Sequence, residues 1–399
     1  MSLTTAARRL APPALLAGIA ALSACSALTG GIGNDQASGG GRPTGFVYTT
    51  LYNRGAVLEI NAVQSRVEKD PIVVGNGPRG LTMDPRGRQL YLYVVCELGN
   101  TVAVVDRRNR LVNRTISVGT RPYAMAIAPT GTKGFVSNTD DDTVSVIDIP
   151  TNTVVQTVSL TTPDVNTGLQ PGTPTSGAGQ KRLRPKGIAT NATGSAVYVA
   201  CEGGALAILQ GNPGSGAPQQ GGTAGQIASY SPVRTVPLVG SVAPLNVAVA
   251  TSPQGGDTVY VTDPRANRVF LLNTANGAGQ AELRDIQGGP YDVAVGRNAG
   301  GTPDSVYVTL ETLDALQVFG LDLSQRNPAY RVEGRQPQAV EVSSLGNEVY
   351  VSLAGSNNVA VFSRLNSGLG LPAVFNLQQL DPSFIAPTGD LALGGFLFN

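Results

Sequence analysis

The sequence contains no histidine and no tryptophan, and only 14% of its 399 residues are charged. Without histidine, the chain lacks the usual general base near neutral pH and the commonest transition-metal ligand. Ser-His-Asp and Cys-His catalysis and histidine-bearing zinc sites are therefore excluded. The 28 basic and 27 acidic residues leave a net charge of +1. No basic excess exists to neutralise a phosphate backbone, so nucleic acid is not an expected partner.

Aromatic residues are also few, at 5%, so a core must be built mainly from Val, Ile, Leu and Ala. Hydrophobic residues reach 41%, which suffices for a sizeable core. The 50 glycines and 27 prolines favour many short strands joined by turns over long helices. The composition therefore predicts an all-β fold.

Residues 1–24 have the layout of a signal peptide. Arg8 and Arg9 precede an apolar run, Leu10 to Leu22, that is too short to span a bilayer comfortably. The run ends in Leu22-Ser23-Ala24-Cys25, which resembles the bacterial lipobox. The resemblance implies cleavage before Cys25 and acylation of that residue, with two or three acyl chains that would anchor the protein stably to a membrane. The alternative is ordinary secretory cleavage near the same small residues.

Residues 25–44 are rich in Gly and Ser and cannot bury enough apolar surface to order themselves. We expect them to form a flexible tether between the anchor and a folded body, residues 45–399. The predicted location is the cell envelope, at the outer membrane and periplasm or at the cell surface.

From Phe46 onward the chain repeats one phrase: an aromatic–Val strand, a short polar loop and an alternating apolar strand. Seven copies are present, and their aromatic residues are Phe46, Tyr93, Phe135, Tyr198, Tyr260, Tyr307 and Tyr350. A second marker, a proline followed by an alternating strand, opens six of the units, at Pro78, Pro122, Pro185, Pro244, Pro290 and Pro337. The period of roughly 42–47 residues fits four strands per unit, as in a propeller blade.

The segment Val144-Ser145-Val146-Ile147-Asp148, followed by Thr151-Asn152, resembles the consensus of the YVTN β-propeller repeat family. This resemblance covers almost the whole mature chain and implies a seven-bladed β-propeller of four-stranded antiparallel blades. Related propellers include lactonase-like and surface-layer proteins. A β-sandwich or an unclosed solenoid is the alternative, but neither requires this four-strand period.

The two ends of the repeat region predict how the ring closes. The first copy lacks a proline-led strand, and a seventh proline-led segment begins at Pro387. We expect the C-terminal strand Leu391–Leu393 to complete the first blade, which removes two open sheet edges. Two low-complexity insertions, near residues 162–183 and 210–229, are predicted to be surface loops without strands.

The mouth of the central channel is the expected binding face. It should carry the loop before each proline-led strand and the loop after each Tyr-Val strand. The candidate ligand-binding residues are Arg79, Glu97, Arg121, Tyr123, Asn138, Arg184, Lys186, Glu202, Asp263, Tyr291, Glu311 and Arg335. Arginine and carboxylate around a concave mouth suit a polar or anionic ligand. The alternative is that these charges pair with one another.

Glu97, Glu202 and Glu311 occupy equivalent positions in alternate copies, an arrangement that suits a hard cation such as Ca²⁺. The alternative is that they are solvated loop acids, and no other cofactor is expected. Cys96 and Cys201 also share a position, two units apart. On a propeller that separation, roughly 15 Å, exceeds disulfide reach, so both are predicted to be buried free thiols.

Two functions remain open. The first is a non-enzymatic binding or scaffold module for an envelope protein or a small polar ligand, consistent with the anchor, the tether and the missing histidine. Such a module is expected to be monomeric. The second is a lactonase-like hydrolase that uses a carboxylate-bound metal at the channel mouth. We predict no catalytic residues, and the fold alone does not choose between the two functions.

Overall fold

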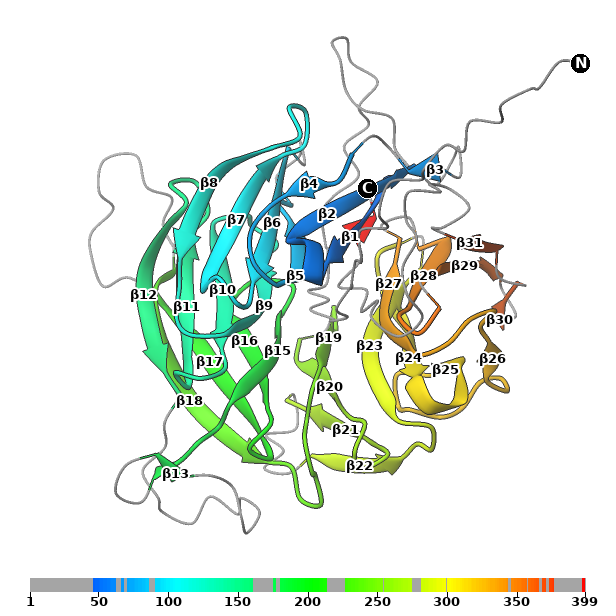
Figure 1. Ribbon diagram of the computed structural model, residues 1–399. Helices are drawn as coiled ribbons and strands as arrows, with labels where there is room; N and C mark the ends of the chain where they lie inside the picture. Colours follow the sequence, from blue (N-terminus) through cyan, green and yellow to red (C-terminus); the bar gives the residue numbers. More distant parts are fainter. Residues whose placement is uncertain are drawn as a thin grey trace, which may run out of the picture.

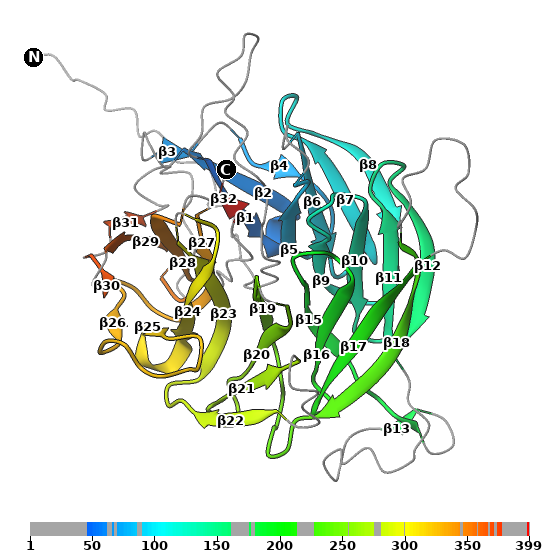
Figure 2. The ribbon, with the colours of Figure 1, turned by 180° about the vertical axis from the view of Figure 1, so that it is seen from behind.

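The computed structural model describes residues 46–61, 66–67, 70–85, 90–160, 175–176, 180–213, 227–253, 255–274, 281–298, 300–343, 346–356, 358–365, 368–370, 373–376 and 397–398. These residues form a seven-bladed β-propeller in which each blade is one antiparallel sheet (Figures 1 and 2). The described part of the chain contains no α-helix, and its helical turns are the 3₁₀ segments η1 (Tyr52–Arg54) and η2 (Glu311–Leu313). Within that part, no helix is long and apolar enough to cross a membrane.

In blades 2 to 6 the neighbouring strands follow one another in chain order, whereas in blade 1 the strand beside β1 comes from the end of the chain. Blade 1 holds β1 (Phe46–Leu51), β2 (Ala56–Asn61), β3 (Arg66–Val67) and β4 (Ile72–Val73), together with β32 (Leu397–Phe398). Blade 2 holds β5 (Pro78–Met83), β6 (Tyr91–Cys96), β7 (Thr101–Asp106) and β8 (Leu111–Ser117). Blade 3 holds β9 (Pro122–Ile127), β10 (Lys133–Asn138), β11 (Thr143–Asp148) and β12 (Thr153–Ser159).

The other four blades repeat this order. Blade 4 holds β15 (Pro185–Thr190), β16 (Ala196–Cys201), β17 (Ala205–Pro213) and β18 (Ile227–Pro237). Blade 5 holds β19 (Val247–Thr251), β20 (Asp257–Asp263), β21 (Arg268–Asn273) and β22 (Glu282–Asp285). Blade 6 holds β23 (Pro290–Arg297), β24 (Pro303–Leu310), β25 (Ala315–Phe319) and β26 (Tyr330–Arg331). Blade 7 holds β27 (Pro337–Val342), β28 (Glu348–Leu353), β29 (Asn358–Leu365), β30 (Gly368–Leu369) and β31 (Ala373–Asn376).

In blades 1 to 6 the aromatic residue of the repeat packs against the following blade, which explains why the repeat carries it. Tyr93, Tyr198 and Tyr260 are almost fully buried. Their hydroxyls donate to Asn152 Oδ1 at 2.7 Å, Asp257 Oδ2 at 2.7 Å and the Leu321 carbonyl at 2.6 Å, respectively. A ring buries a large apolar area, and a buried hydroxyl needs a partner.

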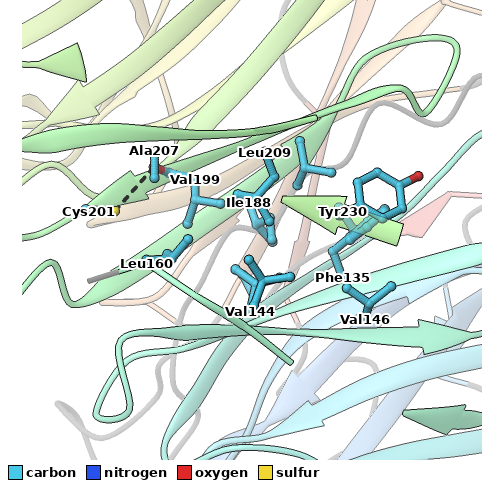
Figure 3. Packing of buried hydrophobic residues seen from close by; sticks show 14 of the residues in the cluster. Phe135, Val144, Val146, Leu160, Ile188, Val199, Cys201, Ala207, Leu209 and Tyr230 are labelled. Atoms are coloured by element: carbon cyan, nitrogen blue, oxygen red, sulfur yellow. Dashed lines mark hydrogen bonds between the residues drawn. The ribbon is translucent and has the colours of Figure 1, made fainter. Parts of the chain in front are cut away.

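Blade 3 has phenylalanine at this position, and blade 4 supplies the compensating group. The Phe135 ring meets Tyr230 of β18 edge-on, with centroids 4.6 Å apart (Figure 3). Tyr230 donates its hydroxyl to the Gly194 carbonyl at 2.8 Å. Gln156 of β12 adds a two-way bond, accepting from Tyr230 N at 2.9 Å and donating to its carbonyl at 2.6 Å. The interface between blades 3 and 4 is therefore apolar inside and hydrogen-bonded at its outer edge.

Three details differ from the sequence predictions. In blade 5 the innermost strand begins at Val247, after Pro244, although the other described proline-led strands start at the proline. The first insertion contains a short hairpin of β13 (Thr175–Ser176) and β14 (Gln180–Lys181), so it is not free of strands. The second insertion lies at the tip of the β17–β18 hairpin, where pairing continues out to Pro213↔Ile227. The register of the two strands is unbroken up to Ile208, shifts there, and the pairing then resumes.

The C-terminal segment reaches blade 1. In β32, Leu397 and Phe398 pair with Tyr48 and Val47 of β1. The predicted closing strand Leu391–Leu393 lies outside the described residues, as do the predicted signal peptide, Cys25 and the tether. Closure by that strand therefore stays a prediction.

The two described cysteines are free and fully buried, as predicted. Cys96 and Cys201 donate to the carbonyls of Val94 and Val199 in their own strands. Burial raises the pKa of the Cys96 thiol to about 11 and that of Cys201 to about 12.

Candidate functional site

The start of each innermost strand and the end of the next strand lie at the same end of the ring. This follows from the pairs Pro78↔Cys96, Pro185↔Cys201, Pro290↔Leu310 and Pro337↔Leu353. The two loop sets predicted to share a face therefore do so, and we call this face the mouth. The residues that follow the six prolines are Arg79, Tyr123, Lys186, Leu245, Tyr291 and Gln338.

The backbone before these prolines is unusual. Arg121, Arg184 and Gln336 have positive φ values of 50°, 52° and 53°. Such angles are rare for residues other than glycine, and proline further restricts the residue before it. Local strain of this kind persists only where the surroundings enforce it.

A side chain from the preceding blade enforces this conformation. Asn100, Asp142 and Asp314 accept the backbone N–H of Arg121, Arg184 and Gln336 at 2.9, 2.6 and 2.8 Å. Each acceptor lies in the turn between the second and third strands of its blade and itself has a positive φ. Asn267 makes the same bond to Gly289 N at 2.8 Å. We call these residues the Asn/Asp clamp, and they fix the mouth loops from blade to blade.

Glu97 is the centre of the first charged group of the mouth. Its carboxylate accepts Arg79 Nε at 2.5 Å, Arg121 Nη2 at 2.6 Å and the Tyr52 hydroxyl at 3.1 Å. Glu97 is only 4% exposed. Burial alone would raise the pKa of Glu97, but the charge of Arg79 and the hydrogen bond from Arg121 outweigh it and lower the pKa.

Glu202 holds the second group. Arg184 Nε lies 3.0 Å and Lys186 Nζ 3.6 Å from its carboxylate. Asp140 lies between the two groups, 3.7 Å from Arg121 Nε and 3.9 Å from Arg184 Nη2. Burial would raise the pKa of Glu202, but Lys186 and Arg184 lower it.

Tyr123 joins the two groups. The Arg79 guanidinium lies 4.9 Å and Lys186 Nζ 4.5 Å from the centroid of its ring. Two cations thus contact one buried phenol. The ring attracts both cations, whereas Arg79 and Lys186 repel each other. Burial lowers the pKa of Lys186, and the charge of Glu202 opposes that effect. The phenol stays neutral because burial raises the pKa of Tyr123 well above its usual value.

Across the channel, blades 6 and 7 contribute a less charged side. Burial raises the pKa of Tyr291 to about 12, and Arg79 is the nearest charge that counteracts it. Glu311 accepts Gln338 Nε2 at 2.6 Å. The mouth therefore has a side rich in cations, formed by blades 2 to 4, and a less charged side that contains Tyr291, Gln338 and the acid Glu311.

Three predicted residues have other surroundings. Asn138 is buried, accepts Gly119 N at 3.1 Å and donates to Ser145 Oγ at 2.9 Å. Asp263 is buried and accepts the backbone N–H groups of Val242, Ala243 and Ala266. Arg335 is exposed, and its backbone N–H donates to Ser356. Asn138 and Asp263 shape loops, and among the described residues no hydrogen bond or ion pair joins any of the three to Glu97 or Glu202.

Sequence reasoning missed Tyr52, Asp140 and Gln338. Gln338 had a usable signal, because it follows a strand-opening proline just as Arg79 does. Tyr52 and Asp140 lie in the loops after the aromatic–Val strands of blades 1 and 3, which the same rule places at the mouth. Their partners, Glu97 for Tyr52 and Arg184 for Asp140, come from the following blades and could not be read from the repeat.

The carboxylates of the mouth are already paired with cations. Among the described residues, no three or more Cys, Asp or Glu side chains come close enough together to hold a metal ion. Glu97 and Glu202 each face two basic groups instead. A divalent ion at these carboxylates stays a prediction.

No protein-family model matches the sequence, and no curated protein matches it. Solved structures do match. A periplasmic gluconolactonase of Pseudomonas aeruginosa aligns with a TM-score of 0.58 and 18% identity over 88% of this chain and 98% of its own. A putative 6-phosphogluconolactonase of Bacteroides fragilis aligns with a TM-score of 0.59 and 14% identity over 89% of this chain and 98% of its own.

A third match shows how widely the architecture is used. Hydrazine synthase of Kuenenia stuttgartiensis aligns with a TM-score of 0.58 and 15% identity over 79% of this chain and 92% of its own. At such identities the likeness concerns the fold and not the chemistry. The chain is a seven-bladed β-propeller whose structural neighbours include lactonase-like proteins.

Proposed function

We propose that this protein is a non-enzymatic binding module of the cell envelope that holds a small anionic ligand at the mouth of its propeller. The proposal includes export and a lipid anchor at Cys25. The YVTN-like repeat supports the assignment to surface and periplasmic propellers, and the mouth supports the choice of ligand.

One observation carries the ligand class. Arg79, Arg121, Arg184 and Lys186 share the three carboxylates of Glu97, Asp140 and Glu202. In this set the cations outnumber the acids, and the charged groups of Arg79 and Lys186 both contact the ring of Tyr123. A carboxylate or phosphate placed between them would relieve their repulsion and form charge-assisted hydrogen bonds.

The experiment is calorimetric titration of the protein with phosphate, citrate and gluconate at low salt. Binding of at least one anion is expected, with a Kd at least about ten-fold weaker in Lys186→Met. Glu202 keeps Arg184 in this variant, so no buried acid is left unpaired. Arg284→Met is the matched control, because Arg284 lies on β22 and pairs with Glu282 away from the mouth. No binding by any of the three anions, or equal loss in both variants, would rule out the anion site.

The anchor is tested separately. Cys25→Ser removes the acylated thiol, so the mature protein should move from the membrane fraction to the soluble exported fraction. Metabolic labelling with a palmitate analogue should mark the wild type and not the variant. Unchanged fractionation would refute the lipid anchor without affecting the mouth.

A lactone hydrolase is the second candidate function. It is favoured by the two neighbours named as gluconolactonases, and a carboxylate-bound metal at the mouth would be its cofactor. Hydrolysis of gluconolactone, followed by acid release with and without added Ca²⁺, decides between the two functions. Turnover lost on Glu97→Gln, together with one tightly bound divalent ion per chain, would replace the binding proposal.

A further inference from the structure

A second cavity lies at the end of the ring opposite the mouth, between blades 4 and 5. It has a volume of about 290 Å³. Its walls come from the start of β16, the ends of β17 and β21, the middle of β18 and the start of β20. The lining residues are Asn191, Ser195, Ala196, Tyr198, Ile208, Gln210, Val233, Arg234, Asp257, Leu272 and Thr274.

Asp257 forms the polar part of this cleft. It is 5% exposed, and its Oδ2 accepts the Tyr198 hydroxyl at 2.7 Å and Asn191 Nδ2 at 3.2 Å. The backbone N–H of Asp257 bonds to Thr274 Oγ1 at 2.8 Å, so the carboxylate is fixed in position. Among the described residues no hydrogen bond reaches Oδ1, which leaves that oxygen as an acceptor for a ligand.

Other blade interfaces close the same place without a carboxylate. Tyr93 meets an asparagine side chain, Tyr260 meets a backbone carbonyl, and Phe135 packs on Tyr230. At the blade 4–5 interface an acid takes this role and a cleft opens beside it. The equivalent Tyr350 of blade 7 donates to an acid of its own strand, Glu348, so a contact to an acid of the next blade, as at Asp257, is not required by the repeat.

We propose that this cleft binds a neutral polyhydroxylated molecule of about monosaccharide size. Its lining carries one acid, Asp257, and one base, Arg234, so neither an anion nor a cation is favoured by net charge. Hydroxyl, amide and carboxylate groups offer both donors and acceptors, as a ring of hydroxyls requires. Ile208, Leu272 and Val233 give apolar walls for the C–H faces of the ring. The volume is at the small end for ligand sites, which limits the ligand to about one ring.

The test uses saturation-transfer NMR with glucose, galactose, mannose, N-acetylglucosamine and myo-inositol as probes. At least one should bind with a Kd in the millimolar range or tighter. Asp257→Asn keeps the size and the bond from Tyr198 but removes the charge, and it should weaken binding about ten-fold, because hydrogen bonds to a charged acceptor are the stronger ones. Val233→Phe fills the cleft from a side chain that is 60% exposed, so it should abolish binding and leave the fold intact.

Lys186→Met separates the two sites, because it changes the mouth at the other end of the ring and should leave sugar binding unchanged. Citrate and spermidine serve as charged competitors. No signal from any of the five probes, or a signal that survives Val233→Phe, would overturn the proposal. Displacement by citrate or spermidine at equal concentration would also overturn it, because the cleft would then select for charge.

Discussion

Individual residues at the mouth couple charge to stability. Glu97 is buried and pairs with two arginines. Removal of its charge would leave Arg79 and Arg121 without this partner at a site partly shielded from solvent. Removal of one member of a buried pair costs more than the net contribution of that pair. Arg121 is half exposed, and solvent screening reduces the contribution of its ion pair with Glu97 to stability.

Glu97→Gln should therefore lower the free energy of unfolding by about 2 kcal/mol at pH 7. The pKa of Glu97 is lowered in the folded state, so its stabilisation is present above the unfolded pKa of about 4.3 and is lost as pH falls through the folded value. The difference between wild type and variant in urea unfolding should shrink below about pH 4. Asp285→Asn, which breaks the exposed pair with Arg268, is the control and should cost less than about 0.5 kcal/mol. Equal costs for the two variants would contradict this picture.

The buried thiols give a second prediction at this scale. The thiolate is the reactive form, and burial raises the pKa of Cys96 to about 11 and of Cys201 to about 12. A soluble form that begins at Ser26 should thus show no reaction with Ellman's reagent at pH 8 while folded, and two thiols per chain in guanidinium. Because the raised pKa values belong to the folded state, the two thiols also make stability fall as pH rises above about 9. Rapid labelling of the folded protein would show that the blades open or that the thiols lie nearer the surface.

At the scale of elements, the second strands of blades 2, 4 and 5 are joined to the next blade by the hydroxyl of their tyrosine. The Tyr260 hydroxyl bonds the Leu321 carbonyl at 2.6 Å across the blade 5–6 interface. Tyr260→Phe should lower the free energy of unfolding by about 1 kcal/mol, because a buried carbonyl loses its donor. Tyr91→Phe is a matched control, since no hydrogen bond of the Tyr91 hydroxyl is seen among the described residues. Both are measured by urea denaturation, and a loss for Tyr91→Phe equal to that for Tyr260→Phe would contradict the role of the hydroxyl.

The inner strands of each blade were predictable, and the outer ones were not. β6, β11 and β20 are rich in apolar residues and buried along most of their length, because both faces are covered by neighbouring blades. β22 is exposed at every residue, so no apolar pattern marks it. The extension of β17 and β18 was hidden for a similar reason, because Gly211 and Pro213 are typical of loops although both belong to the backbone ladder.

The site was predictable only in part. The sequence placed Arg79, Glu97, Arg184 and Glu202 on one face, because repeats put equivalent residues at equivalent heights. Which charges pair depends on contacts between neighbouring blades, as between Glu97 of blade 2 and Arg121 at the start of blade 3. The cleft beside Asp257 had no signal in the sequence, because it arises from the fit of two whole blades.

At the scale of the whole molecule, the ring has to be closed to be stable. The C-terminal strand β32 pairs with β1, and the residues before it include the seventh proline-led segment. Deletion of the residues after Phe384 should lower the melting temperature by several degrees or more, because it exposes two sheet edges and the core of blade 1. Deletion of residues 26–43, the predicted tether, is the control and should leave the melting temperature unchanged. An unchanged melting temperature in the C-terminal deletion would refute closure by this segment.

The Asn/Asp clamp has a consequence for how such a protein can be altered. The clamp acts on the backbone before four of the six prolines, and the positions after the prolines carry five different residue types, at Arg79, Tyr123, Lys186, Leu245, Tyr291 and Gln338. Tyr123 and Leu245 also pack in the core and Arg79 pairs with the buried Glu97, so the positions open to exchange are those of Lys186, Tyr291 and Gln338. Libraries randomised at these codons alone would therefore yield receptors of new ligand specificity on an unaltered backbone. After duplication of a blade, the same positions could diverge in evolution without a change of the backbone.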